Sequence, residues 1–466
     1  MQEVRKENPL GTERMGRLIM RYSTPAIASI LVHALYNITD QIFIGRGFFG
    51  YEGLGVPGIA ATNVAFPLVI FSMALSLLIG VGTSVTFNLK LGAGDREAAA
   101  KAAGNGLNMA VFFGLLLGGA ALILGDRLLD FFGTTDEIYP YVAPYMKIIC
   151  FSIPIQVFVT AASKLIRADG SPTFSMVCIM SGAVVNIILD PILIYVFGMG
   201  MAGAGFATLI GLCFSAFLSA YYVLRKFKCV RLDVGCYRPN SVIIKRICAL
   251  GVTACVNQLA LAVVQITMNN TLRYYGANSI YGSEIPLACV GAISKINVVF
   301  LAFVIGIAQG CQPIHSFNYG AKKYERVKTA YIAALISSTV FSTLIFIVFQ
   351  LFPRPVMSIF GQGSEEYFLF SERYLRIFMF FIFLNGIQPV TANFFNSIGK
   401  AKVGITLSLT RQIAFLVPLL LLLPRFFGID GVVYAGPISD GAAFLLAGFF
   451  IIREIKELNR LIYSRS

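Results

Sequence analysis

The sequence contains no tryptophan, only two histidines and few charged residues, which make up 13% of its 466 positions. His33 and His315 fall in different halves and are expected near opposite membrane faces, which argues against an intramembrane catalytic site built from both. Without tryptophan, an aromatic belt at the membrane surface would have to be built from tyrosine. Hydrophobic residues account for 57% of the chain, so the low charge indicates a polytopic membrane protein.

The nine cysteines form no C-x-x-C pair and no cluster with histidine at metal-ligand spacing, which argues against structural zinc. Most of them lie in apolar segments or in predicted inner loops, and disulfides are rare in a reducing cytoplasm. The first 21 residues carry charges of both signs, unlike a cleavable signal peptide.

Apolar segments recur along the whole chain and predict twelve membrane-spanning helices. They lie near residues 18–45, 57–89, 102–125, 138–163, 172–197, 200–224, 246–272, 285–317, 329–352, 368–396, 403–424 and 431–452. If the spans alternate from a cytoplasmic N-terminus, the inner segments hold most of the 37 lysines and arginines. The positive-inside rule then places both termini in the cytoplasm and explains the net charge of +14 without a nucleic-acid partner.

The two halves of the chain resemble one another. LGAGDRE at 91–97 corresponds to YGAKKYE at 319–325, a shift of 228 residues, and nearly the same shift relates Gly170 to Gly399 and Gly203 to Gly431. Six spans return the chain to its starting side, so the halves share one orientation. The predicted fold is therefore an all-α polytopic membrane protein of twelve transmembrane helices, in two six-helix bundles related by a pseudo-two-fold axis along the membrane normal. The expected lobes are residues 1–228 and 229–466, joined by a basic cytoplasmic linker around 226–246.

Charged residues inside the spans differ between the halves. Asp40 and Asp190 lie in the first half, where a buried carboxylate usually marks an ion or proton path, although either could serve only to hold helices together. The second half contains Lys295, Arg411 and Asp440. We favour a charge pair between Lys295 and Asp440 over a coupling role for either.

Other polar residues are predicted at the depth of the two aspartates. Counting 1.5 Å per helical residue places Asn186, Thr208 and Tyr145 with Asp40 and Asp190 in the outer half of the first bundle.

His33, Tyr36 and Asn37 share one helix face with Asp40. Carboxylate and amide oxygens suit Na⁺, but two close carboxylates could equally share a proton, and the residues do not choose between these ions. Pro25, earlier in the same span, permits a bend.

Five segments carry a resemblance to a known family. They are TPAI at 24–27, NITDQIFIG at 37–45, LGAGD at 91–95, RADG at 167–170 and NIILDP at 186–191. With them the chain resembles the multidrug and toxic compound extrusion (MATE) family over essentially its whole length, and within it the prokaryotic, MepA-type branch.

That resemblance implies secondary active efflux of small organic drugs, cationic or amphipathic, by antiport of H⁺ or Na⁺, with the two bundles rocking about a central site. It implies a monomer in the cytoplasmic membrane of a prokaryote, with no enzyme activity and no cofactor. It places the coupling cation among the residues that share the outer half of the first bundle, and associates the span-1 proline with helix bending. These residues are Asp40, Asp190, Asn186, Thr208, Asn37, Tyr36 and Tyr145, with Pro25 as the bending residue.

The chain departs from the family branches that have carboxylates in spans 7 and 10, because those spans here offer only amides. The amides are Asn257, Gln258, Gln265, Asn385 and Gln388. A lipid-linked oligosaccharide flippase of the same superfamily is the main alternative, but it needs a cationic cavity, and we identify only Lys147 near a span of the first half. A cation channel is less favoured, because its filter would require a symmetric oligomer.

Overall fold

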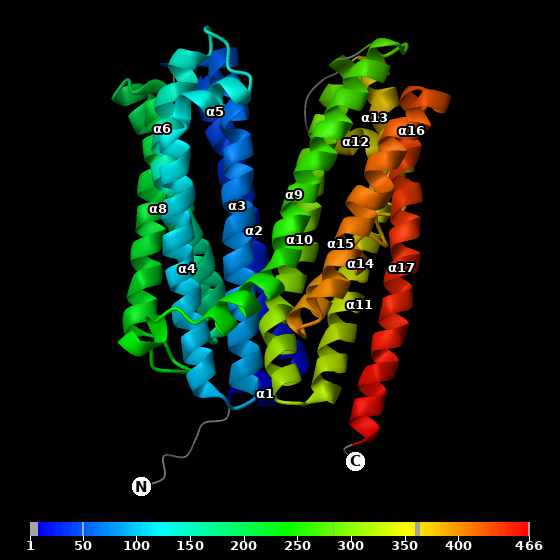
Figure 1. Cartoon of the computed structure of the whole chain (residues 1–466). Coiled ribbons are helices and arrows are strands. Elements are labelled where there is room, and N and C mark those ends of the chain that lie inside the picture. The colour runs from blue at the N-terminus through cyan, green and yellow to red at the C-terminus, as the bar shows by residue number, and fades with distance from the viewer. Residues whose placement is uncertain (1–7, 49–50, 283, 359–363, 465–466) are drawn as a thin grey trace. The chain divides into compact units, whose positions relative to one another are not determined.

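A computed structural model describes residues 8–48, 51–282, 284–358 and 364–464, and these are almost entirely helical (Figure 1). The elements of the first half are α1 (Pro9–Thr12), α2 (Met15–Arg46), β1 (Gly47–Phe48), β2 (Tyr51–Glu52), α3 (Gly55–Gly92), α4 (Arg96–Ile123), α5 (Gly125–Phe131), α6 (Tyr139–Ala168), α7 (Pro172–Pro191), the π-helix η1 (Ile192–Val196), α8 (Gly200–Arg225) and the short 3₁₀ helix η2 (Val234–Tyr237). Those of the second half are α9 (Ser241–Ala277), α10 (Glu284–Gly320), α11 (Tyr324–Leu351), α12 (Pro353–Ser358), α13 (Glu365–Ile377), α14 (Ile387–Ser397), α15 (Ala401–Leu409), the π-helix η3 (Thr410–Leu416), α16 (Val417–Phe427) and α17 (Ile429–Tyr463).

Within the described ranges, eleven helical segments are long and apolar enough to cross a membrane, which confirms a multi-pass helical protein. The tenth predicted span, 368–396, is interrupted. Helix α13 ends at Ile377 and α14 begins at Ile387, and the intervening backbone forms tight turns such as the bond from the Asn385 N–H to the Ile382 carbonyl. A broken helix at membrane depth is tolerated where it is buried in protein or lines a cavity.

The chain divides into two compact units. The N-terminal unit consists of Ala28–Cys255 with the residues up to Leu10, and the C-terminal unit joins Gly11–Ile27 to the chain from Val256 onward. Helices α2 and α9 therefore contribute to both units. This division differs from the predicted lobe boundary at 228/229, because the sequence repeat does not show which part of a long helix packs with which bundle.

Backbone geometry supports the internal repeat. Gly94 has φ +83° and Lys322, one repeat length away, has φ +57°. Gly170 and Gly399 have φ +89° and +88°. Positive φ is rare for residues other than glycine, so two matching pairs indicate that the same turns follow the same helices in both halves.

The start of α4 is stabilised by its N-cap residue. The Asp95 carboxylate accepts a hydrogen bond from the Ala98 N–H at 3.0 Å, and this bond lowers the pKa of Asp95 below its usual value. Its repeat counterpart Lys323, before α11, makes no side-chain cap and donates instead to the Gly11 carbonyl at 3.0 Å.

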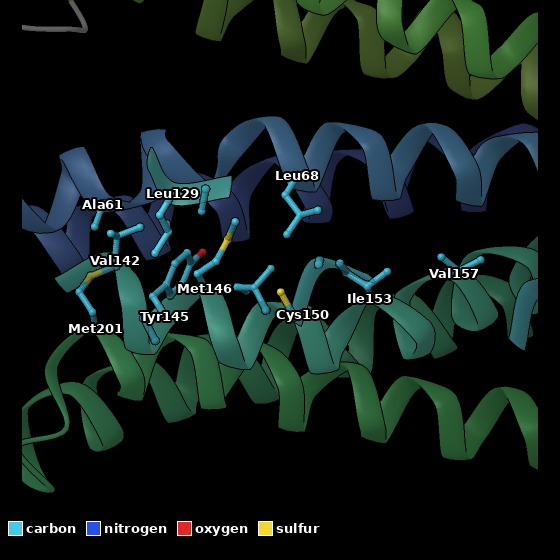
Figure 2. Packing of buried hydrophobic residues seen from close by; sticks show 14 of the residues in the cluster. Ala61, Leu68, Leu129, Val142, Tyr145, Met146, Cys150, Ile153, Val157 and Met201 are labelled. Atoms are coloured by element: carbon cyan, nitrogen blue, oxygen red, sulfur yellow. The ribbon is translucent and has the colours of Figure 1, made fainter. Parts of the chain in front are cut away.

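The hydrophobic core of the N-terminal unit is centred on α6. Apolar side chains of α3, α5, α6 and α8 pack together there (Figure 2), and the same cluster includes Met109 and Ala110 of α4. Tyr145 belongs to this cluster although it carries a hydroxyl, and only 8% of its surface is exposed. Packing in this core therefore holds Tyr145, one of the predicted site residues, in place.

The central linker runs from the end of α8 at Arg225 to the start of α9 at Ser241, and Asn105 of α4 holds its far end. The Asn105 amide donates to the carbonyls of Cys236 at 3.2 Å and Arg238 at 3.1 Å, and its oxygen accepts from the Asn240 N–H at 2.8 Å. One buried side chain thus satisfies three backbone groups of the linker.

Asp169, directly after α6, holds the near end of the linker. Its carboxylate accepts hydrogen bonds from the N–H groups of Lys228 and Cys229, both at 2.8 Å, and from the Tyr222 hydroxyl at 2.9 Å. Burial raises the pKa of Asp169, although these hydrogen bonds oppose the increase. The linker is therefore fastened to the N-terminal unit at both ends.

Candidate functional site

The site in the N-terminal unit begins where α7 and α8 cross closely. A Cβ atom on Gly211 would lie 2.6 Å from the Gly182 carbonyl oxygen and 3.2 Å from the Asn186 Cβ. Small residues allow membrane helices to approach this closely. As a result Asn186 reaches the next helix, and its amide nitrogen lies 3.4 Å from the Thr208 hydroxyl.

Asp190 lies one turn beyond Asn186 on α7 and is fully buried. The Asn186 amide donates to Asp190 Oδ1 at 3.3 Å. Asp190 Oδ2 is buried without a hydrogen-bond partner. A single weak donor therefore serves this carboxylate, far fewer than a buried anion needs.

Asp40 of α2 completes the acidic pair. Its carboxyl group is in side-chain hydrogen-bonding contact with that of Asp190, and its Oδ1 is buried without another partner. Two carboxylates in contact cannot both stay ionised unless a cation or a shared proton lies between them.

Three buried oxygen atoms of these neighbouring side chains have no donor: Asp40 Oδ1, Asp190 Oδ2 and Asn186 Oδ1. Leaving a buried acceptor unsatisfied costs about 1–3 kcal/mol. An all-oxygen set of carboxylate and amide groups fits a hard monovalent cation or a proton. No group of three or more His, Cys, Asp or Glu side chains with metal-binding geometry occurs in the described part of the chain.

Two tyrosines border the acidic pair. Tyr36 of α2 and Tyr145 of α6 both lie near enough to Asp40 and Asp190 for electrostatic interaction. A neutral tyrosine hydroxyl is able to donate to a carboxylate or to accept a cation.

Asn37 lies at the edge of this group. Its amide donates to the His33 carbonyl on its own helix at 2.7 Å, its side chain is exposed, and it is in side-chain hydrogen-bonding contact with Tyr36. The structure therefore brings together Asp40, Asp190, Asn186, Thr208, Tyr36 and Tyr145, and Asn37 adjoins them through Tyr36.

Tyr195, which the sequence reading did not single out, connects two parts of the site. It lies in η1, the π-helix that directly follows Asp190 and Pro191, and its hydroxyl donates to the Phe43 carbonyl at the end of α2. The sequence signal for irregular helix at this point was Pro191, because a proline lacks the N–H that a regular helix requires. π-Helices are frequent at functional sites.

Pro25 is buried within α2, which remains helical on both sides of it. The division between the two units falls two residues later, after Ile27. Helix bending at Pro25 stays a prediction.

The intramembrane charges of the C-terminal unit differ from the predicted pair. Asp440 Oδ1 accepts from Arg411 Nε at 2.9 Å, and its Oδ2 accepts from the Asn385 amide, also at 2.9 Å. Lys295 of α10 is exposed and makes no ion pair with Asp440. Sequence position alone placed Lys295 and Arg411 at similar depths and could not show which one faced the carboxylate.

The first half also contains two buried cations that the sequence reading did not assign to a span. Lys164 and Arg167 lie in the last two turns of α6 and are 7% and 5% exposed. Cations at a helix C-terminus interact favourably with its dipole. They lie about 28 to 33 Å along α6 from Tyr145, so they do not neutralise the acidic pair.

Two helical repeats, with a buried oxygen cluster in the first, define the class of two-lobed membrane transport proteins. A family model described as MatE matches residues 25–192 and again 254–421, one copy in each half. The chain belongs to the MatE family, which confirms the resemblance seen in the sequence.

Individual relatives agree with this assignment. The chain is 24% identical over 431 residues to the multidrug export protein MepA of Staphylococcus aureus, covering 92% of each protein. Its fold matches an outward-facing multidrug resistance MATE transporter of the MOP superfamily, with a TM-score of 0.89 and 24% identity over 98% of this chain and 100% of the other. It also matches a MOP-superfamily transporter from Pyrococcus furiosus, whose binding pocket is described as having reverse polarity, with a TM-score of 0.88 and 23% identity over 98% and 100%.

Proposed function

We propose that the protein exports small organic compounds, cationic or amphipathic, in exchange for H⁺ or Na⁺ that binds between Asp40 and Asp190. The observation that carries this proposal is the set of three buried oxygens without donors in the N-terminal unit. Such oxygens are satisfied when a cation or proton is bound and unsatisfied when it leaves, so the free energy of the bundle depends on occupancy.

The exported compounds follow from the family and the named relatives, one of which is a multidrug export protein. Alternating access by two bundles of a parallel repeat provides the mechanism. The cation and the drug would bind with different affinities to the inward-open and outward-open states, and each would favour a different state. This difference couples cation entry to drug export. We further propose that the protein is a monomer in a prokaryotic cytoplasmic membrane, as its family membership suggests. The distribution of lysine and arginine supports placing both termini inside.

The acidic character of the site disfavours a flippase for pyrophosphate-linked lipids. The buried cations Lys164 and Arg167 lie at the other end of α6, too far away to form one anion site with the residues around Asp190.

Transport in proteoliposomes tests the proposal. A fluorescent organic cation is loaded, and an outside-to-inside gradient of Na⁺ or of H⁺ is imposed separately, on the wild type, Asp190→Asn and Asp440→Asn. Export should follow one gradient in the wild type and in Asp440→Asn, and should fail in Asp190→Asn. Wild-type export by Asp190→Asn and by Asp40→Asn would show that the acidic pair is structural.

A further inference from the structure

The C-terminal unit has its own buried carboxylate, Asp440 of α17, which is 5% exposed. Unlike Asp190, it has a donor for each oxygen: Arg411 on one side and the Asn385 amide on the other, both at 2.9 Å. A full positive charge therefore lies directly against this carboxylate.

Both donors come from irregular backbone. Arg411 lies in η3, the π-helix between α15 and α16, and Asn385 lies in the turns that interrupt the helix between α13 and α14. Irregular backbone inside a membrane protein gives up regular helical hydrogen bonds and is found where it builds a site. Two such segments converge on the two oxygens of one side chain.

The groups around Asp440 would otherwise suit a cation. They comprise two carboxylate oxygens, the Asn385 side chain and the nearby Tyr374 ring, which lies close enough to Asp440 for electrostatic interaction. Tyr374 is the repeat counterpart of Tyr145, which borders the acidic pair of the N-terminal unit. The main difference is that a guanidinium, which keeps its charge at every accessible pH, is present here.

A free cation could bind Asp440 only by displacing Arg411. The displaced guanidinium would then be left in a poorly solvated place without its counterion, which is strongly unfavourable. The side chain of Arg411 is only 23% exposed, so water could replace the carboxylate only in part.

Building on the proposed antiport, we infer that Arg411 is a built-in counter-cation that occupies a latent cation site at Asp440 and confines ion coupling to the N-terminal unit. Removing the guanidinium should open that site to one Na⁺ or one proton. Arg411 is thus a residue that sets the number of coupling ions per protein, although it contacts neither the drug nor the coupling ion.

The test counts bound cations. Full-length protein in lipid nanodiscs is titrated for sodium-22 binding and for proton uptake between pH 5 and pH 9. The numbers of Na⁺ ions and protons bound per protein are then added. Arg411→Gln should hold about one cation more than the wild type, and the double variant Arg411→Gln/Asp440→Asn should return to the wild-type number. A folded Arg411→Gln protein with the wild-type number would overturn the inference.

Asp440→Asn keeps the inference testable if Arg411→Gln does not fold. Because Asp440 binds no coupling ion in the wild type, this variant should keep the wild-type number of cations. A loss of about one cation would mean that Asp440 binds a coupling ion, and would overturn the inference. Asp190→Asn, measured in parallel, tests the proposed antiport alone: an unchanged number there would refute cation binding at the acidic pair whatever Arg411→Gln does.

Discussion

In the N-terminal unit, two carboxylates share one weak amide donor and leave buried oxygens without partners, whereas in the C-terminal unit one carboxylate has both oxygens bonded, one of them by a guanidinium. The two centres are not copies of one another. At the repeat shifts of 228 and 229 residues, Asp40 corresponds to Met268 or Asn269 and Asp190 to Pro418 or Leu419, and none of these carries a charge. A shared fold has therefore diverged into an open anionic centre and a closed neutral one.

This difference indicates how an internally repeated transporter can couple an ion asymmetrically. A carboxylate alone does not make a coupling site, because its partners decide whether a mobile cation can reach it.

The largest effect is expected from the acidic pair. Asp40→Asn and Asp190→Asn should each reduce gradient-driven export by about tenfold or more, because both remove a charge from the same cation. The double variant should then be no worse than either single one, since the two side chains act as one unit. Gradient-driven export in proteoliposomes measures this, with monodispersity in detergent as the folding control. If the double variant reduced export by the product of the two single reductions, the aspartates would act separately.

The next effect concerns the stability of the closed centre. Arg411→Gln should lower the free energy of unfolding by about 3 kcal/mol, because Asp440 loses a permanent counterion that the entering Na⁺ or proton replaces only in part. Arg411→Gln/Asp440→Asn should recover most of that loss, since a neutral pair can still form a hydrogen bond. Thermal unfolding followed by circular dichroism compares them. Equal destabilisation in the single and double variants would show that the loss comes from packing and not from the charge.

Asn385→Ala should lower the free energy of unfolding by a smaller amount, about 1–2 kcal/mol, since it removes one donor from Asp440 and leaves Arg411 in place. It should also change drug preference more than ion dependence. The ratio of transport under Na⁺ and H⁺ gradients, measured with several fluorescent cations, separates these effects. If Asn385→Ala abolished ion dependence while Asp40 and Asp190 remained intact, the coupling site would have to lie in the C-terminal unit.

The smallest effect is expected at the N-terminus of α4, which has its repeat counterpart at the N-terminus of α11. Asp95→Ala should cost about 1 kcal/mol at pH 7, because it removes the N-cap bond to Ala98. Because folding lowers the pKa of Asp95, this stabilisation is present above the unfolded pKa of 3.8 and is lost as the pH falls through the folded value. Melting temperatures of the wild type and the variant should therefore converge as the pH falls below 3.8 and through the folded pKa. Lys323→Ala, at the uncapped counterpart, should show no such convergence.

Much of the architecture was predictable, because the bilayer imposes long apolar helices that can be read from composition and charge distribution. The repeat was visible in short glycine-containing segments whose backbone conformation few other residues adopt. The break within the tenth span was not predictable. Residues 378–386 are as apolar as a continuous helix would be, and hydropathy does not report backbone conformation.

The acidic site was predictable for a similar reason. Asp40, Asp190 and Asn186 are expensive in a membrane, so their positions alone indicated a shared purpose. Lys295 was misplaced because a helix face is wide, and small rotations decide whether a side chain points at a site or away from it. Tyr195 and Arg411 depend on π-helices, which shift the register of a helix without a reliable sequence signal.

The fastening of the central linker has a consequence for the order of the two halves. Asn105 and Asp169 hold the linker, and their counterparts in the second half are Ala333 and Ile398, which cannot make these bonds. The two halves are therefore not interchangeable along the chain: a protein with their order exchanged would leave the linker without its partners.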